Sequence, residues 1–369
     1  MSTRKKSKGK LSEEKLRKVM ELIFSDDNYV SMAIYGIVVA SQELYFGEGA
    51  ERGLNVIEKV KIPTNGGEMV KSYFSGTKQR GIERRAIAYS IVKGKDGEEP
   101  YYRYFGLTID ISDSKYKDLV PDPRDILTYM WGATWTNPPA FIRGRVSYGG
   151  GVSIQAEPFD IKTRNRVEYR HYDVLKKENK ESTEEEKTET GQMVWYKEYV
   201  QPYTLFPVVR HGFLLGVNNM EPHALAYAFL QMLVMAGAGT PKGMTIFEGK
   251  WLEEDKIEPV LVVDVYKGLA PEPVIIPPHV TSIGEALRIF KEKTESYGGI
   301  LKELPDKHEE IFNKTRKRPI RLVGKSAYDF LRKLAEEFSR EYLMKIEELK
   351  IPRVTKAKRL GILTGESNE

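Results

Sequence analysis

Two groups of basic residues stand among aromatic residues in this sequence, a combination suited to single-stranded nucleic acid. Lysine and arginine pair with phosphate oxygens, and aromatic rings stack on unpaired bases. The first group surrounds two aromatic residues at positions 73 and 74 and comprises Lys71, Lys78, Arg80, Arg84 and Arg85. Glu83 is the one acid between positions 71 and 85. The alternative interpretation is a solvated face whose arginine stems cover apolar surface.

The second group lies in segments with strand character. It comprises Arg143, Arg145, Lys162, Arg164, Arg166, Arg170 and His171. Tyr148, Phe159, Tyr169 and Tyr172 are interleaved with it. Aromatic residues on a sheet with basic neighbours hold single-stranded bases and backbone, although the strict RRM aromatic signature for base reading is absent. The alternative is a set of cross-strand ion pairs with Glu157, Asp160 and Glu168.

The glycine-rich stretch GAGTPKG, residues 237–243, is a third candidate contact. It follows the end of a predicted helix, so it lacks the positive dipole of a phosphate-binding helix start, and it has no Walker spacing. The simplest interpretation is a helix stop. Its backbone amides, with Lys242 beside them, can still approach a sugar-phosphate chain closely.

Catalytic and metal-binding patterns are weak. Zero cysteines exclude disulfides, thiolate catalysis and thiolate zinc sites. No paired metal-ligand spacing occurs among the histidines His171, His211, His223, His279 and His308, and we interpret each as a structural or surface residue. An acidic loop with Asp110, Asp113 and Asp118 could hold a hard metal ion, but such loops usually face solvent. The net charge of +5 is too small to argue for nucleic acid by itself.

The elements that must position these residues follow from the pattern of apolar residues. Apolar, β-branched runs predict buried strands at 31–41, 86–92, 204–217 and 259–266. Shorter segments predict strands or ribbon at 141–147, 152–156 and 166–172. Helical spacing and capping residues predict helices at 11–24, 221–235, 282–294 and 326–349. Strand, helix and strand occur twice, which favours an α+β fold with an RRM-like or ferredoxin-like core and large peripheral insertions.

The insertions divide the chain. We expect a basic tail and helix at 1–24, a discontinuous core at 25–95, 140–175 and 195–280, an inserted subdomain at 96–139, a mobile lid or thumb tip at 176–194, a helical domain at 281–350 and a tail at 351–369. Residues 176–190 are nearly free of apolar side chains, so disorder is expected there. No run of about 18 apolar residues or secretory signal occurs, which predicts a cytoplasmic protein without a membrane partner. Abundant Lys and Glu without Cys match hyperthermophile proteins.

Several of these segments, taken in order, resemble a known family. They are TKQRGIERR, the Trp131–Gly132 turn before FIRGRVSYGGG, TRNRVEYR, YVQPYTLFPVV and GAGTPKG, which together span about residues 30–270. In this order the sequence is similar to the crRNA-backbone proteins of the RAMP superfamily, and specifically to the type I-D branch (Csc-two) of the CRISPR-associated Cas-seven family.

The resemblance implies an RRM-like core with a lid or thumb, a small inserted domain and a helical domain. It implies a non-enzymatic subunit that polymerises along a CRISPR guide RNA and grips the RNA backbone while the bases pair with target DNA. The expected partners are crRNA, further copies of the chain, other interference-complex subunits and target DNA through the guide. Both basic groups and Lys242 are then RNA-binding residues.

One departure concerns zinc, which the family often binds through a C-x-x-C pair ahead of the Trp-Gly turn. This chain has Asp122 and Asp125 there, a poorer structural zinc pair, so no cofactor is expected. The main alternative function is a metal-independent endoribonuclease, with His171 beside Tyr172, or His211, as general base. A subunit with its own target-cutting aspartate is a further alternative. A duplex-DNA binder is disfavoured because no helix-turn-helix or zinc-finger pattern occurs.

Overall fold

The fold is built on two strand–helix–strand units. The computed structural model describes residues 29–51, 54–91, 126–136, 139–167, 192–215, 220–236, 243–315 and 318–344. The first unit is β1 (Tyr29–Ala40), α2 (Gly76–Ile91) and β8 (Val146–Gly150). The second is β11 (Leu205–Leu215), α6 (Glu221–Met235) and β15 (Leu261–Tyr266). The strands lie in the order β15-β1-β11-β8, and each is antiparallel to its neighbours. This is ferredoxin-like topology, so the predicted α+β fold is confirmed.

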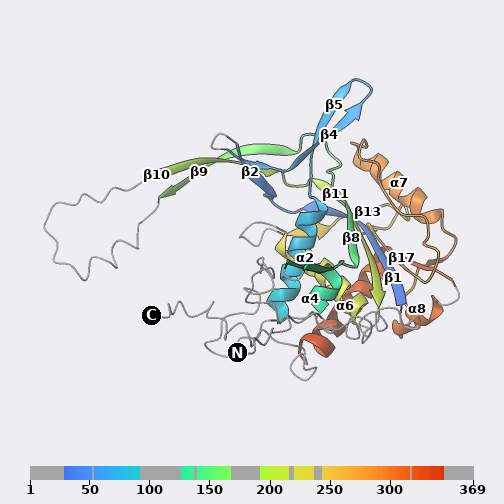
Figure 1. Cartoon of the computed structure of the whole chain (residues 1–369). Helices are drawn as coiled ribbons and strands as arrows, with labels where there is room; N and C mark the ends of the chain where they lie inside the picture. The colour runs from blue at the N-terminus through green and yellow to red at the C-terminus, as the bar shows by residue number, and fades with distance from the viewer. Residues whose placement is uncertain are drawn as a thin grey trace, which may run out of the picture.

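The remaining strands extend the core or project from it. β17 (Ile320–Val323) and β16 (Ile300–Leu301) continue the sheet beyond β15, and β12 (Met244–Ile246) pairs with the end of β1. The second sheet has the order β2-β3-β10-β9, from β2 (Gly47–Glu51), β3 (Leu54–Ile57), β9 (Phe159–Val167) and β10 (Gln192–Val200). Figure 1 shows β9 and β10 leaving the core as a long ribbon, while the hairpin of β4 (Lys59–Thr64) and β5 (Gly67–Ser72) projects beside it.

Short pairs and further helices complete the described structure. The pairs are β6 (Ala133–Thr136) with β7 (Pro139–Ile142), and β13 (Glu248–Gly249) with β14 (Glu258–Pro259). The helices are α4 (Ile126–Trp131), α7 (Ile283–Glu295), α8 (Glu309–Lys314) and α9 (Gly324–Glu337), and α9 continues as the π-helix η3 (Phe338–Leu343). None of the helices in the described ranges is long and apolar enough to cross a membrane.

The central sheet is buried on both faces. In β1, Met32 and Ile34 face a layer of helices that includes α2, α6 and α9. Their neighbours Ala33 and Tyr35 belong to a second cluster, which includes Phe290 of α7. A strand covered on both sides reads as a nearly continuous apolar run, which is why the sequence predicted it. The predicted strands at 204–217 and 259–266 and the helices at 221–235 and 282–294 are likewise confirmed.

The predicted strand at 86–92 is wrong, because residues 76–91 form helix α2. The buried positions Gln79, Ile82, Glu83, Ala86 and Ile87 recur at helical spacing. The apolar residues that suggested a strand at 86–92 lie in the second half of α2, and some of them belong to this buried face. The basic residues before it therefore lie on a helix that covers the sheet, not at the edge of the sheet.

Three other predicted elements differ in extent. The strand at 141–147 is split, because β7 ends at Ile142 and β8 begins at Val146. A Cβ on Gly144 would lie 2.8 Å from the Trp131 carbonyl oxygen, so the chain bends closely past the Trp-Gly turn. Residues 152–156 form no strand beyond one bridge at Val152, since their backbone bonds go to separate partners. The helix predicted at 326–349 becomes π-helical at 338, and the one at 11–24 lies outside the described residues.

The division into domains stays a prediction. The six core elements fall within 25–95, 140–175 and 195–280. In the range expected to be helical, 281–350, the strands β16 and β17 belong to the central sheet. The described part of 96–139 contains α4 and β6. The lid tip expected at 176–194 lies outside the described residues up to 191, and residues 192–194 begin strand β10.

A buried ion pair joins α2 to the sheet. Arg210 of β11 donates from Nε to Glu83 at 2.7 Å, and both side chains are fully buried. The Tyr148 hydroxyl donates to the other Glu83 oxygen at 2.6 Å, and it accepts a hydrogen bond from the Trp131 indole at 2.7 Å. Burial raises the pKa of the Glu83 carboxyl, while Arg210 and Tyr148 lower it. One network thus connects α2, α4, β8 and β11.

A second buried pair holds α7 against the opposite face of the sheet. Arg321 of β17 donates two hydrogen bonds of 2.7 Å to the two oxygens of Asp264 on β15. Its remaining donors reach the carbonyl oxygens of Lys293 and Thr294 at the end of α7, and that of Glu272. Such a planar fork suits bidentate pairing, and here it also satisfies carbonyls that a helix end leaves open.

Lys71 of β5 is a third buried cation. Its ammonium donates to the carbonyl oxygens of Ile154 at 2.8 Å and Val280 at 2.6 Å, and the residue is 0% exposed. Burial lowers the pKa of Lys71 from 10.5 to about 8. The contacts tie the hairpin strand to two loops that lie far apart in the sequence.

Replacing Arg210 with Met should lower the free energy of unfolding by about 3–5 kcal/mol, because Glu83 would remain buried without its counter-charge. The double variant Arg210→Met/Glu83→Leu should regain much of this loss. Chemical denaturation measures both. The control Arg288→Met, which removes an exposed pair with Glu292, should change stability by about 0.5 kcal/mol or less. Equal effects at Arg210 and Arg288 would contradict the proposed importance of the buried pair.

Lys71 should make stability depend on pH in the alkaline range. Between about pH 8 and 10.5 the unfolded chain keeps the Lys71 proton that the folded chain releases, so the free energy of unfolding should rise with pH. The rise should be about 3 kcal/mol at most. Urea titrations at several pH values should show a smaller rise in Lys71→Met. The exposed Lys61→Met serves as control and should keep the full rise; the same slope in all three proteins would count against the shift.

Candidate nucleic-acid interface

Basic residues recur at alternate positions of the β9–β10 ribbon. Lys162, Arg164 and Arg166 are alternate residues of β9, and a strand places alternate residues on one face. In the antiparallel register, Lys197 of β10 lies opposite Lys162 and Trp195 lies opposite Arg164. These five positions therefore share one face of the ribbon, which has four basic positions and one aromatic position.

Two lysines at the base of the ribbon contact aromatic rings. The Lys197 ammonium lies 3.7 Å from the centre of the Tyr45 ring, and the Lys59 ammonium lies 4.3 Å from that of Phe159. Lys59 also pairs with Glu198 at 2.5 Å. Neither lysine was among the predicted site residues. The sequence signal that points to Lys197 is its place among the aromatic residues of β10, after Trp195 and Tyr196 and before Tyr199.

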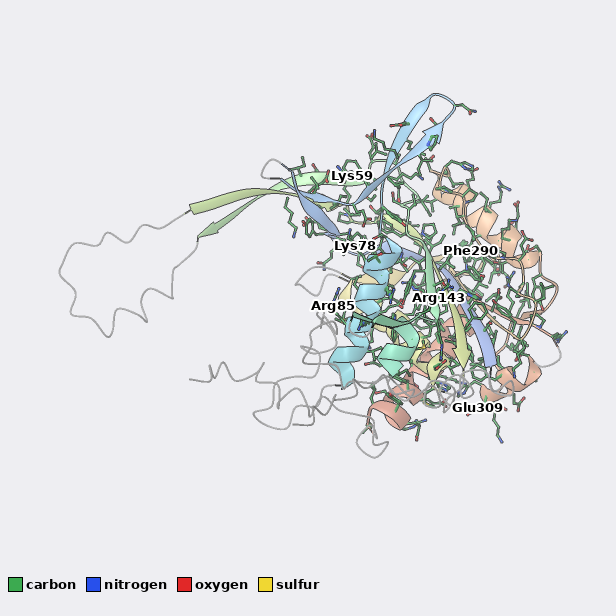
Figure 2. All side chains as sticks on the ribbon, in the orientation of Figure 1. Lys59, Lys78, Arg85, Arg143, Phe290 and Glu309 are labelled. Carbon is green, nitrogen blue, oxygen red and sulfur yellow. The ribbon has the colours of Figure 1, made fainter. Side chains whose placement is uncertain are left out.

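The first basic group lies mostly on the outer side of α2. The inner side of α2 is buried. On the rest of the helix, Arg80 is exposed, and Lys78, Arg84 and Arg85 are half-buried. Lys78 pairs with Glu58, which also accepts a 2.7 Å hydrogen bond from Ser75 and lies just before β4. The start of α2 is thus fastened near the base of the ribbon. Figure 2 shows Lys59, Lys78 and Arg85 in this order from the ribbon base along α2.

The two arginines between β7 and β8 differ in their surroundings. Arg143 is exposed. Among the described residues, Arg143, Arg80 and Arg85 form no ion pair. Arg145 is 11% exposed in its side chain and donates to Glu221 of α6 at 2.7 Å. The expected strand that would put both on one face is absent. Arg143 is available to a ligand, whereas Arg145 fastens the loop to α6.

Lys71 does not lie with the other predicted residues. It is buried, and both of its contacts are backbone carbonyls inside the molecule. We therefore assign Lys71 to packing and leave it out of the interface. Arg170, His171 and Lys242 lie outside the described residues, as do the acidic residues at 110–125. Their assignment stays a prediction.

The face of the central sheet opposite α2 carries a histidine and a tyrosine in contact. His211 of β11 and Tyr266 of β15 form a hydrogen bond through Nε2 and the hydroxyl group. The Phe213 ring stands edge-on to the imidazole at 4.6 Å and is half exposed. Burial lowers the pKa of His211 below its ordinary value of 6.5, so the ring is mainly neutral at pH 7. A neutral imidazole beside a hydroxyl is a possible acid–base pair.

Potential metal ligands meet at a different place. Among the described residues, one such group forms, from His223, His308 and Glu337 in the layer of helices. The ribbon and α2 instead bring together cations and aromatic rings. That arrangement can bind phosphates and stack bases, and it supplies no nucleophile activated by a neighbouring base within the described interface.

Solved structures with a related arrangement include two CRISPR proteins. No protein-family model and no curated protein sequence matches the chain. Csc2 of Thermofilum pendens aligns over 89% of this chain and 92% of its own, with 15% identity and a TM-score of 0.38. A chain of a CRISPR RNA-guided surveillance complex in a pre-nicking state aligns over 72% of this chain and 88% of its own, with 9% identity and a TM-score of 0.37. The first of these structures is a Csc2 protein, the branch to which the sequence resemblance pointed, and the second comes from a CRISPR complex.

Proposed function

We propose that this chain binds single-stranded RNA along the sugar-phosphate backbone, as a non-catalytic backbone subunit of a type I-D-like CRISPR interference complex. The observation that carries the proposal is the row of basic residues that runs from the β9–β10 ribbon to α2. Positions 162, 164, 166 and 197 share a ribbon face, and Lys78, Arg80, Arg84 and Arg85 follow on α2. Aromatic residues occur beside the cations at Trp195 and Tyr45.

This arrangement favours backbone contacts over base reading. Arginine forks pair with phosphate oxygens whatever the base, and ring stacking tolerates every base. The bases of a guide RNA held in this way remain free to pair with target DNA. Further copies of the chain along the same crRNA, and other subunits of the complex, are the partners that this role requires. Single-stranded DNA should bind too, since the described contacts do not demand a 2′-hydroxyl.

The second candidate function is metal-independent RNA cleavage. The contact of His211 with Tyr266 favours it, because a neutral imidazole can accept a proton as general base and a nearby hydroxyl can donate one as general acid. Incubation of the pure protein with CRISPR repeat RNA separates the two functions. Intact RNA that shifts in a gel supports backbone binding. Discrete products that disappear in His211→Gln would support the nuclease instead.

Replacing Arg84 and Arg85 together by Ala should weaken binding of all single-stranded RNA sequences, by roughly tenfold per lost phosphate contact. The slope of log affinity against log salt should fall by about one unit per contact. Fluorescence anisotropy with two unrelated RNAs at several salt concentrations measures both. The control Arg288→Ala/Arg332→Ala removes the same charge from α7 and α9 and should bind normally. Normal binding by the folded α2 variant would show that the RNA lies elsewhere.

Arg143 and Arg145 should respond differently to Ala. Arg143→Ala should lower RNA affinity with a change in the free energy of unfolding of about 0.5 kcal/mol or less, because the side chain is exposed. Arg145→Ala should lower stability by about 1–3 kcal/mol, because it leaves buried Glu221 without this partner. Parallel melting and binding curves compare the two. If Arg145→Ala is stable but fails to bind RNA, its ion pair with Glu221 is not its main role.

A further inference from the structure

Three potential metal ligands converge in the helical layer although they lie far apart in the sequence. His223 lies in the first turn of α6, His308 directly precedes α8, and Glu337 ends α9. The Nε2 atoms of both histidines lie 3.0 Å from the same oxygen, Oε2 of Glu337. All three potential ligand atoms lie within 4.8 Å of one another.

Two of these three distances, those from each imidazole to Glu337, are close to those of a zinc site. Zinc binds imidazole nitrogen at about 2.0–2.1 Å and carboxylate oxygen at about 2.0–2.2 Å, so ligand atoms of a tetrahedral site are about 3.3 Å apart. The observed 3.0 Å separations differ from this value by only a few tenths of an ångström. Two imidazoles and one carboxylate form a nitrogen and oxygen ligand set that suits a divalent transition metal.

The side of the cluster formed by aromatic rings is apolar. The Phe312 ring lies 6.3 Å from that of His223, and the Phe330 ring lies 6.4 Å from that of His308. The two phenylalanine rings are 5.9 Å apart and contact each other. The His223 and His308 side chains are only 5% and 8% exposed. Apolar surroundings of this kind limit the access of solvent to the imidazoles and lower the local dielectric constant.

The other side of the cluster opens to solvent. His308 and Glu337 line a surface pocket of about 340 Å³. Its rim carries both signs of charge, from Asp306, Lys307, Glu309, Lys333, Glu336 and Arg340. Glu309 marks this neighbourhood in Figure 2, at the end of the molecule away from Lys59 and the ribbon. Three protein ligands beside an open pocket leave a fourth coordination position for water or an anion.

The backbone changes its helical geometry directly after the carboxylate ligand. Glu337 is the last α-helical residue of α9, and the six residues of η3 that follow are π-helical. π-Helical turns are rare and occur frequently at functional sites. This change adds a local reason to single out Glu337 among the many glutamates of the helices.

We propose that His223, His308 and Glu337 bind one divalent transition-metal ion of the zinc class, with its fourth position open to the pocket. The ion would join α6, α8 and α9 and would replace the hydrogen bonds that the two imidazoles now share with Glu337. Binding requires neutral imidazoles, because only an unprotonated ring nitrogen can coordinate a metal. The proposal does not depend on RNA binding.

The test uses full-length protein stripped with a chelator and titrated with Co²⁺ and then Zn²⁺. Wild type should bind one equivalent of Co²⁺ with visible d–d absorption, lose that absorption when Zn²⁺ replaces it, and melt at a higher temperature with metal. Elemental analysis after dialysis gives the stoichiometry. Wild type that binds no stoichiometric metal overturns the proposal.

Matched variants locate the ion. Glu337→Gln keeps the side-chain volume and should weaken metal affinity at least tenfold, and His308→Gln should do the same. His279→Gln, which removes an exposed histidine, should bind as wild type does. Circular dichroism of the metal-free variants checks folding, and Glu337→Gln decides if His308→Gln does not fold. Wild-type affinity in Glu337→Gln, or equal loss in His279→Gln, overturns the assignment.

Discussion

The buried pair of Glu83 and Arg210 fixes the orientation of the helix that carries the proposed RNA contacts. Both charges are fully buried, so each needs the other, because an unpaired charge inside a protein is strongly unfavourable. Tyr148 and Trp131 extend the network to β8 and α4. Glu83 must therefore face inward. On an α-helix Arg85, two positions on, then turns toward the outer side, while half-buried Arg84 lies at the flank with its Nε buried.

The cations of this chain fall into two classes that composition does not separate. Lys71, Arg145, Arg210 and Arg321 hold elements together from inside, and their partners are carboxylates or backbone carbonyls. Arg80 and Arg143 are exposed, and Arg85 is half-buried at the surface. A binding surface must be built from the second class alone. The small net charge therefore says little about how basic one face of the molecule is.

The fold class was predictable because its main elements carry clear periodic signals. β1 is a long apolar run, and α6 begins at Glu221 and Pro222, as a proline at the start of a helix indicates. α2 was misread because its apolar residues crowd into one half of the helix. The burial of Lys71 was not predictable, since lysines are rarely buried and its two carbonyl partners lie 83 and 209 residues away. The contact between His223 and Glu337 was not predictable either, because the two residues are 114 positions apart in the sequence.

The central sheet also has short edges. β8 has five residues and β16 has two, and they are the end strands of the described sheet. At Gly150 and Gly151, where β8 ends, the backbone takes φ values of 71° and 84° that disfavour further pairing by ordinary residues. Long, flat edges invite strands from other molecules and lead to aggregation. A protein whose central sheet has edges this short can reach a high local concentration with less risk that the central sheets of neighbouring molecules pair edge to edge.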